Sequence, residues 1–164
     1  MKRIILLLFI SALTFNVSAQ TDVTTFILVR HAEKSKDDPR DPSLSEEGIK
    51  RAESLNAMLK QADIAALYSS PYKRTRSTVQ PIADAKGLEV NTYDPRSAAF
   101  LEDIMTKFKG KTIVISGHSN TTPNVVNALI GEDRFKQLSE DDYSKIYIVS
   151  VTEIGKGTVT LLSY

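Results

Sequence analysis

Cysteine and tryptophan are absent from the 164 residues, and histidine occurs only twice. Without cysteine the chain has no disulfide, no thiol nucleophile, no thiolate metal ligand and no lipobox residue for a lipid anchor. A formal net charge of +1 gives no reason to expect binding to nucleic acid or to an anionic membrane. Any affinity for anions must therefore come from a local cluster of residues.

The first residues have the composition of a secretory signal peptide. Residues 1–3 give a basic start, residues 4–10 form an apolar run, and residues 17–19 end the segment with Val-Ser-Ala. Polar residues interrupt the apolar stretch before the roughly 20 residues that a membrane span needs. We therefore expect cleavage after Ala19 and a secreted, periplasmic protein without stable membrane insertion. The remaining residues, 20–164, suffice for one domain.

Two short apolar runs, residues 26–29 and 112–115, are typical of central strands that are buried on both faces. The first run leads directly into Arg30 and His31. The second leads through Ser-Gly into His118, so each of the two histidines follows a predicted central strand.

The segments around these strands alternate between helical and extended patterns. A helix is predicted from the N-cap Ser45, with apolar residues at helical spacing at Ile49, Ala52, Leu55, Met58, Leu59 and Ala62. Further strands are predicted at residues 64–68 and 88–92, and a terminal hairpin at 146–152 and 158–162, around a Gly-Lys-Gly turn. A second helix is predicted to begin near Tyr72, with Pro71 as a proline at the first helical position, and to kink or end at Pro81. Two more helices are predicted, one around Leu101, Ile104 and Phe108 and one from Pro123 to Gly131.

This order predicts an α/β fold, a three-layer sandwich with a largely parallel central sheet flanked by helices. Ligands of such sheets bind beyond the carboxyl ends of the strands. Both histidines are expected at that edge.

The residues expected at this edge suit a phosphoryl group. Arg30 beside His31 combines a bidentate anion clamp with an imidazole that is nucleophilic when neutral. Arg74 follows a strand and a Ser-Ser-Pro turn, and His118 precedes a helix N-terminus that favours anions. Convergence of these four side chains would neutralise a phosphoryl dianion and the charge of its transition state.

Four segments in this order resemble the motifs of the histidine phosphatase (phosphoglycerate mutase-like) superfamily: Leu28 to Glu33, Leu44 to Gly48, Ser69 to Thr75 and Ser116 to His118. The resemblance implies a metal-independent phosphomonoester hydrolase in which His31 forms a phosphohistidine that water then hydrolyses. It also implies that Arg30, Arg74 and His118 hold the phosphoryl oxygens, and Ser119 and Asn120 are added as substrate-binding candidates. His31 is expected at a solvent-facing strand end.

Two carboxyl groups are candidates for the acid that protonates the leaving oxygen. Glu33 lies two residues from His31, although it could equally be a loop residue paired with Lys34 or an arginine. Glu102 lies at the chain distance at which mutase-type members of the family place their acid, at the margin of a helix face that is expected to be buried, although it could also be an ordinary residue on the solvated face of that helix.

Two other readings remain beside the hydrolase. The chain could be a non-catalytic module that binds phosphate or other anions, or a phosphosugar mutase. No metal or other cofactor is expected, because arginines beside the histidines would repel a divalent cation. An acidic run, residues 140–142, is read as a helix start or a solvated loop. The expected partner is a small phosphorylated substrate or a phosphorylated envelope component.

Overall fold

A computed structural model describes residues 22–97 and 99–164. Helices and strands alternate along most of the chain, in the order β1 (Thr24–Arg30), α1 (Glu46–Met58), β2 (Ile64–Ser69), α2 (Lys73–Lys86), β3 (Val90–Thr92), α3 (Ala99–Lys107), β4 (Thr112–Gly117), α4 (Thr121–Ile130), β5 (Lys145–Val151) and β6 (Thr158–Ser163). The segment predicted to be a signal peptide, residues 1–19, lies outside the described residues.

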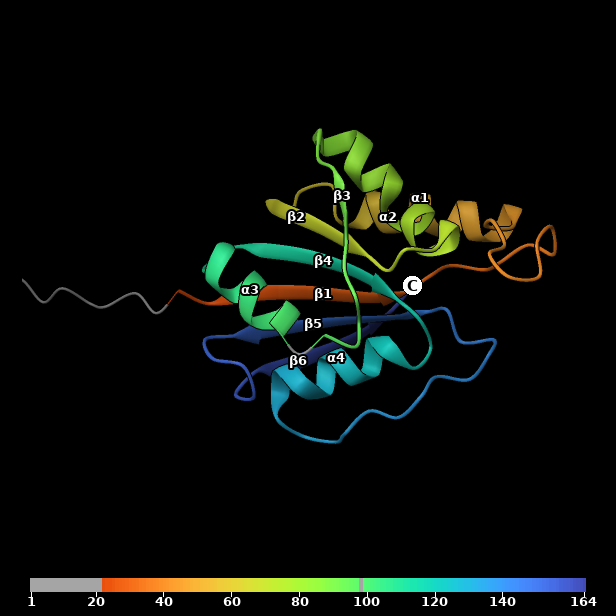
Figure 1. Cartoon of the computed structure of the whole chain (residues 1–164). Helices are drawn as coiled ribbons and strands as arrows, with labels where there is room; N and C mark the ends of the chain where they lie inside the picture. Colours follow the sequence, from red (N-terminus) through yellow and green to blue (C-terminus); the bar gives the residue numbers. More distant parts are fainter. Residues whose placement is uncertain (1–21, 98) are drawn as a thin grey trace, which may run out of the picture.

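The strands form one sheet in the order β3-β2-β4-β1-β5-β6 (Figure 1). The first four strands in this order are parallel, whereas β5 runs antiparallel to β1 and forms a hairpin with β6. The predicted α/β class, the largely parallel centre of the sheet and the terminal hairpin are confirmed.

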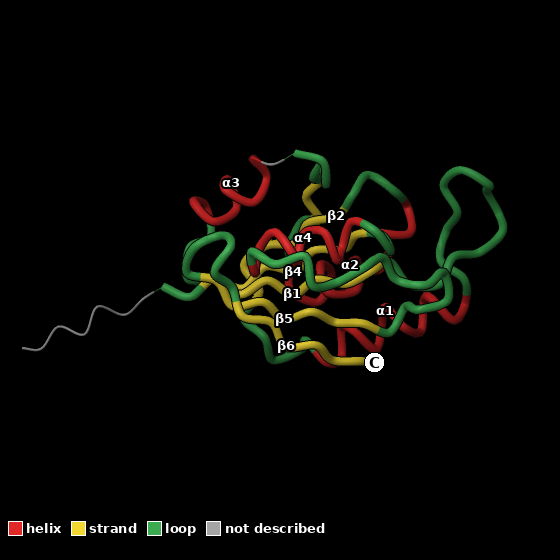
Figure 2. The backbone as a smooth tube through the Cα atoms, turned by 90° about the horizontal axis from the view of Figure 1, so that it is seen from below, coloured by secondary structure: helices red, strands yellow, loops and turns green. Residues whose placement is uncertain are grey.

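Helices cover both faces of the sheet, which gives three layers (Figure 2). Side chains of a strand alternate between the two faces, and β1 is buried on both. Phe26 and Leu28 pack in the core on the side of α3 and α4. Ile27 and Val29 pack in the core on the side of α1 and α2. The apolar run at residues 26–29 is therefore continuous because neither face of this strand meets solvent.

The ends of α1 differ slightly from the prediction. Ser45 is its N-cap, as expected, and its hydroxyl accepts from the backbone N–H of Gly48. The helix ends at Met58, however, and does not continue to residue 62. Ile49 and Met58 are 54% and 50% exposed, so their place on the expected apolar face is wrong.

The predicted starts of two other helices are also shifted. The first helical residue of α2 is Lys73 with Tyr72 as N-cap, so the proline at position 71 precedes the helix. That helix continues through Pro81 to Lys86 and does not end at the proline. Similarly, α4 begins at Thr121, two residues before the proline that was expected to open it.

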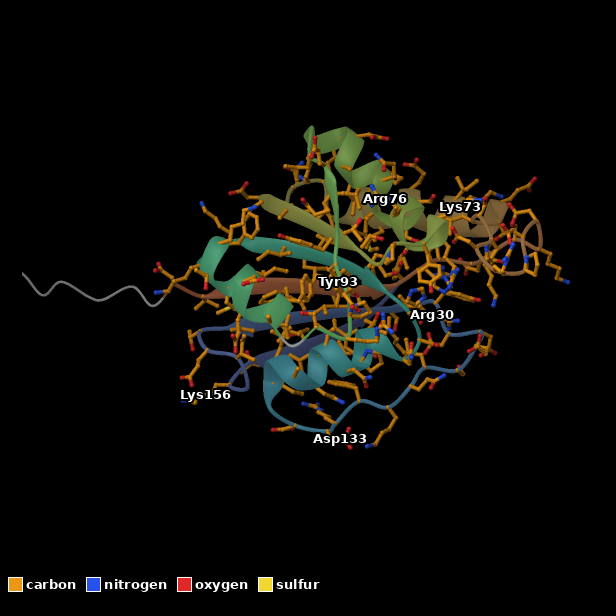
Figure 3. All side chains as sticks on the ribbon, viewed as in Figure 1. Arg30, Lys73, Arg76, Tyr93, Asp133 and Lys156 are labelled. Atoms are coloured by element: carbon orange, nitrogen blue, oxygen red, sulfur yellow. The ribbon has the colours of Figure 1, made fainter. Side chains whose placement is uncertain are left out.

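The parallel strands end level with one another, which positions the site. Arg30 at the end of β1 pairs with Gly117 of β4, and Ser69 of β2 pairs with Ser116. The residues that follow these strand ends therefore meet at one edge of the sheet. Figure 3 shows Arg30 near that edge and Lys156 near the opposite end, so the Gly-Lys-Gly segment is a turn remote from the histidines.

Candidate active site

Arg30 is locked in place by the loop that precedes β5. Its side chain is buried, and its Nη1 donates to the carbonyl oxygens of Ser139 at 2.7 Å and Asp142 at 3.0 Å. The guanidinium carbon lies 4.1 Å from the centre of the Tyr143 ring, in cation–π distance. Its Nε is buried and has no hydrogen-bond partner among the described residues. The Nη1 of Arg30 is thus fixed by two carbonyl oxygens, and its Nε–H remains available to another acceptor.

The tautomer of His31 follows from one hydrogen bond. Its Nδ1 lies 2.8 Å from the carbonyl oxygen of Ala32, and a carbonyl can only accept. The proton of the neutral ring therefore lies on Nδ1, which leaves the lone pair of Nε2 free for attack on phosphorus. Burial, together with the charges of Arg30 and Arg74 and despite the bond to Ala32, lowers the pKa of His31 to about 3.

The exposure of His31 differs from the prediction. The residue is only 4% exposed and does not face open solvent. Its backbone N–H donates to the carbonyl oxygen of Gly117, because the loop after β1 continues alongside the end of β4. This contact brings the ring to 5.4 Å from that of His118, centre to centre.

His118 lies between a serine and an arginine. Its Nδ1 is 3.5 Å from Nη2 of Arg74, a long contact, and its Nε2 is 2.8 Å from the hydroxyl of Ser70. Because a guanidinium can only donate, Nδ1 accepts and Nε2–H donates to Ser70, which in turn donates to Thr75. Burial first, and then the charges of Arg74 and Arg30, lower the pKa of His118 to about 4.

Arg74 is the second cation of the site. Tyr72 stacks 4.6 Å from its guanidinium carbon, and Oδ1 of Asp41 lies 3.6 Å from its Nη1. The same Asp41 oxygen accepts from the backbone N–H of Lys73, which ties the loop after β1 to the start of α2. Nη1 of Arg74 is buried and makes no hydrogen bond within the described part of the chain.

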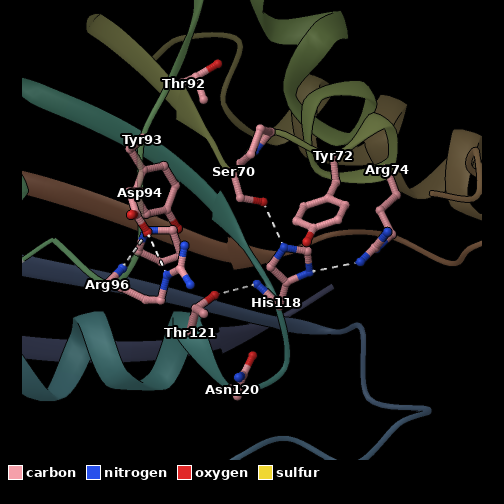
Figure 4. A pocket seen from close by; sticks show the side chains of 12 residues that line it. Ser70, Tyr72, Arg74, Thr92, Tyr93, Asp94, Arg96, His118, Asn120 and Thr121 are labelled. Atoms are coloured by element: carbon pink, nitrogen blue, oxygen red, sulfur yellow. Dashed lines mark hydrogen bonds and ion pairs between the residues drawn. The ribbon is translucent and has the colours of Figure 1, made fainter. Parts of the chain in front are cut away.

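An open cleft of about 730 Å³ adjoins His118 and Arg74, whereas Arg30 and His31 are not among the residues that line it (Figure 4). Figure 4 shows His118 and Arg74 at one side and Arg96 with Asp94 at the other. Its lining residues are Ser70, Pro71, Tyr72, Arg74, Thr92, Tyr93, Asp94, Pro95, Arg96, His118, Asn120 and Thr121. Of the two added binding candidates, Asn120 lines the cleft, whereas the Ser119 carbonyl accepts from the backbone N–H of Leu138.

The structure does not bring the two glutamates to this cleft. Glu33 forms an ion pair with Arg51, with both carboxylate oxygens within 3.0 Å of Nε. The same arginine donates to the carbonyl oxygen of Tyr164 at 2.7 Å. Glu102 is exposed on α3 and lines a separate hollow between α3 and α4. The pairing of Glu33 with an arginine is the alternative that the sequence left open for it.

The acidic run at residues 140–142 lies in a loop and not in a helix. Glu140 is 3.6 Å from Nη2 of Arg30, and Asp142 accepts from Ser144. Within residues 22–97 and 99–164, no group of three His, Cys, Asp or Glu side chains is placed to hold a metal ion.

Sequence reasoning missed Ser70, Asp41, Tyr72 and Tyr143. In the sequence, Ser70 is part of the Ser-Ser-Pro turn before Arg74, and Asp41 lies among other polar residues between two prolines. Only the position of Ser70 directly after a strand, like those of the two histidines, could have marked it. The contacts of Tyr143 depend on the folded loop before β5, for which the sequence contains no local signal.

Comparison with known proteins finds related sequences and structures. A family model described as the histidine phosphatase superfamily (branch 1) matches residues 26–95. Phosphoserine phosphatase 1 of Hydrogenobacter thermophilus is 40% identical over 97 residues, which are 50% of this chain and 46% of that protein. The match thus spans about half the length of this curated relative.

Solved structures show the same fold. A mycobacterial glucosyl-3-phosphoglycerate phosphatase superposes with a TM-score of 0.73 at 12% identity, covering 86% of this chain and 99% of the other. The protein histidine phosphatase SixA, complexed with tungstate, gives 0.69 at 19% identity, covering 85% and 96%. A phosphoserine phosphatase mutant of Entamoeba histolytica, complexed with phosphoserine, gives 0.64 at 18% identity, covering 84% and 95%.

The family match includes most of β1 and the residues Arg30, His31 and Arg74, and the solved structures extend the likeness in fold over most of the described chain. Residues 26–95 thus resemble the histidine phosphatase superfamily, and the described chain has the fold of these solved structures.

Proposed function

We propose that the chain is a phosphomonoester hydrolase that works through a phosphohistidine on His31 and needs no metal. The observation that carries the proposal is the free imidazole Nε2 of His31 together with two buried arginine N–H groups that make no hydrogen bond, Nε of Arg30 and Nη1 of Arg74, the latter 3.6 Å from Oδ1 of Asp41. Buried donors without hydrogen bonds are costly, and a phosphoryl group bound beside His31 would supply acceptors for them.

The reaction follows from these contacts. The phosphoryl oxygens bind Arg30 and Arg74, and Nε2 of His31 attacks phosphorus while the ester P–O bond breaks and the alcohol leaves. Water then attacks the phosphohistidine, the N–P bond breaks, and orthophosphate is released with His31 neutral again. The fixed arginine charges stabilise the negative charge of both transition states.

The leaving oxygen needs a proton when the alcohol is a weak acid. Glu33 is held by Arg51, and Glu102 lies on α3 away from His31. An aryl phosphate needs little protonation of its leaving group, so it is the suitable first substrate. The names of the relatives, phosphoserine phosphatase among them, support small phosphorylated substrates as the class.

Two observations bear on the alternatives to a hydrolase. The low pKa of His31 favours catalysis over simple anion binding, because a cationic imidazole would hold an anion better than a neutral one. The cleft beside His118 is open, which favours transfer to water over the substrate retention that a phosphosugar mutase requires.

We also propose that residues 1–19 direct the chain to export, and that its substrate is a small phosphomonoester or a phosphorylated envelope component in the periplasm. Basic, apolar and small-residue segments in this order support the proposal. No helix among residues 22–97 and 99–164 is long and apolar enough to cross a membrane. Fusion of residues 1–25 to a reporter that is active only after export tests this proposal, and a reporter retained in the cytoplasm would contradict it.

The test of activity is hydrolysis of p-nitrophenyl phosphate by residues 20–164, with and without a chelator, beside the His31→Gln variant. The proposal predicts turnover that resists the chelator and is lost in the variant. Turnover that survives in His31→Gln, or that the chelator abolishes, would overturn the mechanism.

A further inference from the structure

A second hollow of about 370 Å³ between α3 and α4 lies next to the cleft at the candidate active site. Pro95 and Arg96 line both spaces, so they form a common wall. The opposite wall is α4, whose Thr121 lines the first space and whose Asn124 and Ala128 line the second. Because these residues are three and four positions apart, they lie on one face of the helix.

The cleft and the second hollow together are called the groove, and its two ends differ in polarity. The first space contains the Arg74 and His118 side chains described above. The second space has six apolar lining residues, Pro95, Phe100, Leu101, Val125, Ala128 and Ile154, and four polar or charged ones, Arg96, Ser97, Glu102 and Asn124. Leu101 and Val125 are 8% and 6% exposed and belong to the core, so packing in the core holds these two side chains of the hollow in place.

We propose that the second hollow binds an apolar extension of the substrate's leaving group, so that the preferred substrate is the phosphomonoester of an elongated, partly apolar alcohol. This inference rests on the proposed hydrolase function. The phosphoryl group at His31 and Arg74 fixes one end of the substrate, and the remainder runs over Pro95 along α4. From Thr121 to Ala128 the helix rises about 10 Å, which is the length of a medium alkyl chain such as octyl.

The physical basis is transfer of apolar surface from water. A fully buried methylene contributes about 0.8 kcal/mol, which corresponds to roughly fourfold in affinity. An open groove buries each methylene only in part, so roughly two- to fourfold per methylene is expected. Clefts that combine apolar walls with a few charged groups at one end are typical of ligand sites of this kind.

The test compares ethyl, butyl, hexyl and octyl phosphate below their micelle concentrations. The proposal predicts that kcat/KM rises with each added methylene up to about the length of the groove. Ala128→Trp should fill the hollow and remove the dependence on chain length. Ala85→Trp is the matched control, because Ala85 is also an exposed helical alanine but lies on α2, outside the residues that line the groove. Ala85→Trp should keep the dependence of kcat/KM on alkyl chain length.

A binding measurement separates this inference from the hydrolase proposal. Calorimetry with methylphosphonate and octylphosphonate, which are not hydrolysed, should give tighter binding and a more negative heat-capacity change for the octyl compound. Equal binding of both compounds, or a chain-length effect that Ala128→Trp leaves intact, would overturn the groove assignment. His31-dependent hydrolysis of p-nitrophenyl phosphate would still support the hydrolase in that case. If Ala128→Trp does not fold, Ala128→Gln provides the same comparison with a smaller, polar side chain.

Discussion

Nδ1 of His31 lies 2.8 Å from the carbonyl oxygen of Ala32, and this bond leaves Nε2 as the nitrogen that can attack. The backbone carbonyl of the next residue in the chain thus fixes the tautomer of the proposed nucleophile. Orientation by a backbone carbonyl adds no negative charge, so the bond does not cancel the effect of burial and of the two arginines on the His31 pKa.

The rate should change little with pH in mildly acidic solution. An imidazole with the ordinary pKa of 6.5 would be about 97% protonated at pH 5, whereas His31 and His118, with pKa values of about 3 and about 4, remain mostly neutral there. We expect kcat/KM for p-nitrophenyl phosphate, corrected for the second ionisation of the substrate, to vary less than about threefold between pH 5 and 7. A fall of tenfold or more toward pH 5 would contradict the lowered pKa values.

Stability, unlike the rate, should decrease as the pH falls from 7 to 5. Between pH 6.5 and about 3 the unfolded chain binds a proton at residue 31 that the folded chain does not, so unfolding becomes easier as the pH falls. At pH 5 this costs about 2 kcal/mol of stability. His31→Gln removes the cost, so its loss of unfolding free energy between pH 7 and 5, measured with urea, should be about 2 kcal/mol smaller than in the unmodified protein. Identical pH dependence in both proteins would show that His31 keeps an ordinary pKa.

Arg74→Lys should lower kcat by about 100-fold or more, because an ammonium cannot supply the two directed N–H groups of the guanidinium. Arg76→Lys, two residues further along α2, is the matched control. Arg76 donates to Thr92 and the Val90 carbonyl and does not line the cleft. Its replacement should leave kcat within about threefold. Steady-state kinetics decides, and equal rates for the two variants would remove Arg74 from the site.

Glu33→Gln should mainly lower the free energy of unfolding. It should have little specific effect on protonation of the leaving group. The Glu33 and Arg51 side chains are 13% and 21% exposed, and loss of one partner of such a pair is expected to cost about 1 to 3 kcal/mol. If Glu33 only positions the loop, rates for p-nitrophenyl phosphate and for an alkyl phosphate should fall by the same factor. A much larger loss for the alkyl phosphate would identify Glu33 as the acid.

The fold was predictable because the central strands are buried on both faces and therefore have continuous apolar sequences. Residues 26–29 and 112–115 could be placed in the sheet from their composition alone, and the alternation of strands and helices then placed Arg30, His31 and His118 at one edge. Details at helix ends were less predictable. Ile49 has the spacing of a core residue, yet Gly48 beside it packs against the Glu33 backbone and leaves Ile49 outside.

What the sequence could not predict depends on long-range contacts. Whether Glu33 faces substrate or an arginine depends on Arg51, 18 residues away. The bonds between Arg30 and the loop before β5 span more than 100 residues, with no pattern at either end that indicates the pairing. The groove along α4 likewise exists only where α3 and the segment after β3 lie beside that helix.

The central claim is that the phosphoryl group passes through His31, and trapping the intermediate tests it most directly. The unmodified protein and His31→Gln are mixed with a phosphate ester labelled in its phosphoryl group, quenched in alkali within milliseconds, and digested. We predict that an alkali-stable, acid-labile label appears on the peptide containing His31 at up to one phosphate per chain, and that the variant carries none. Label on another residue, or full turnover with no covalent phosphate at any time, would contradict the account.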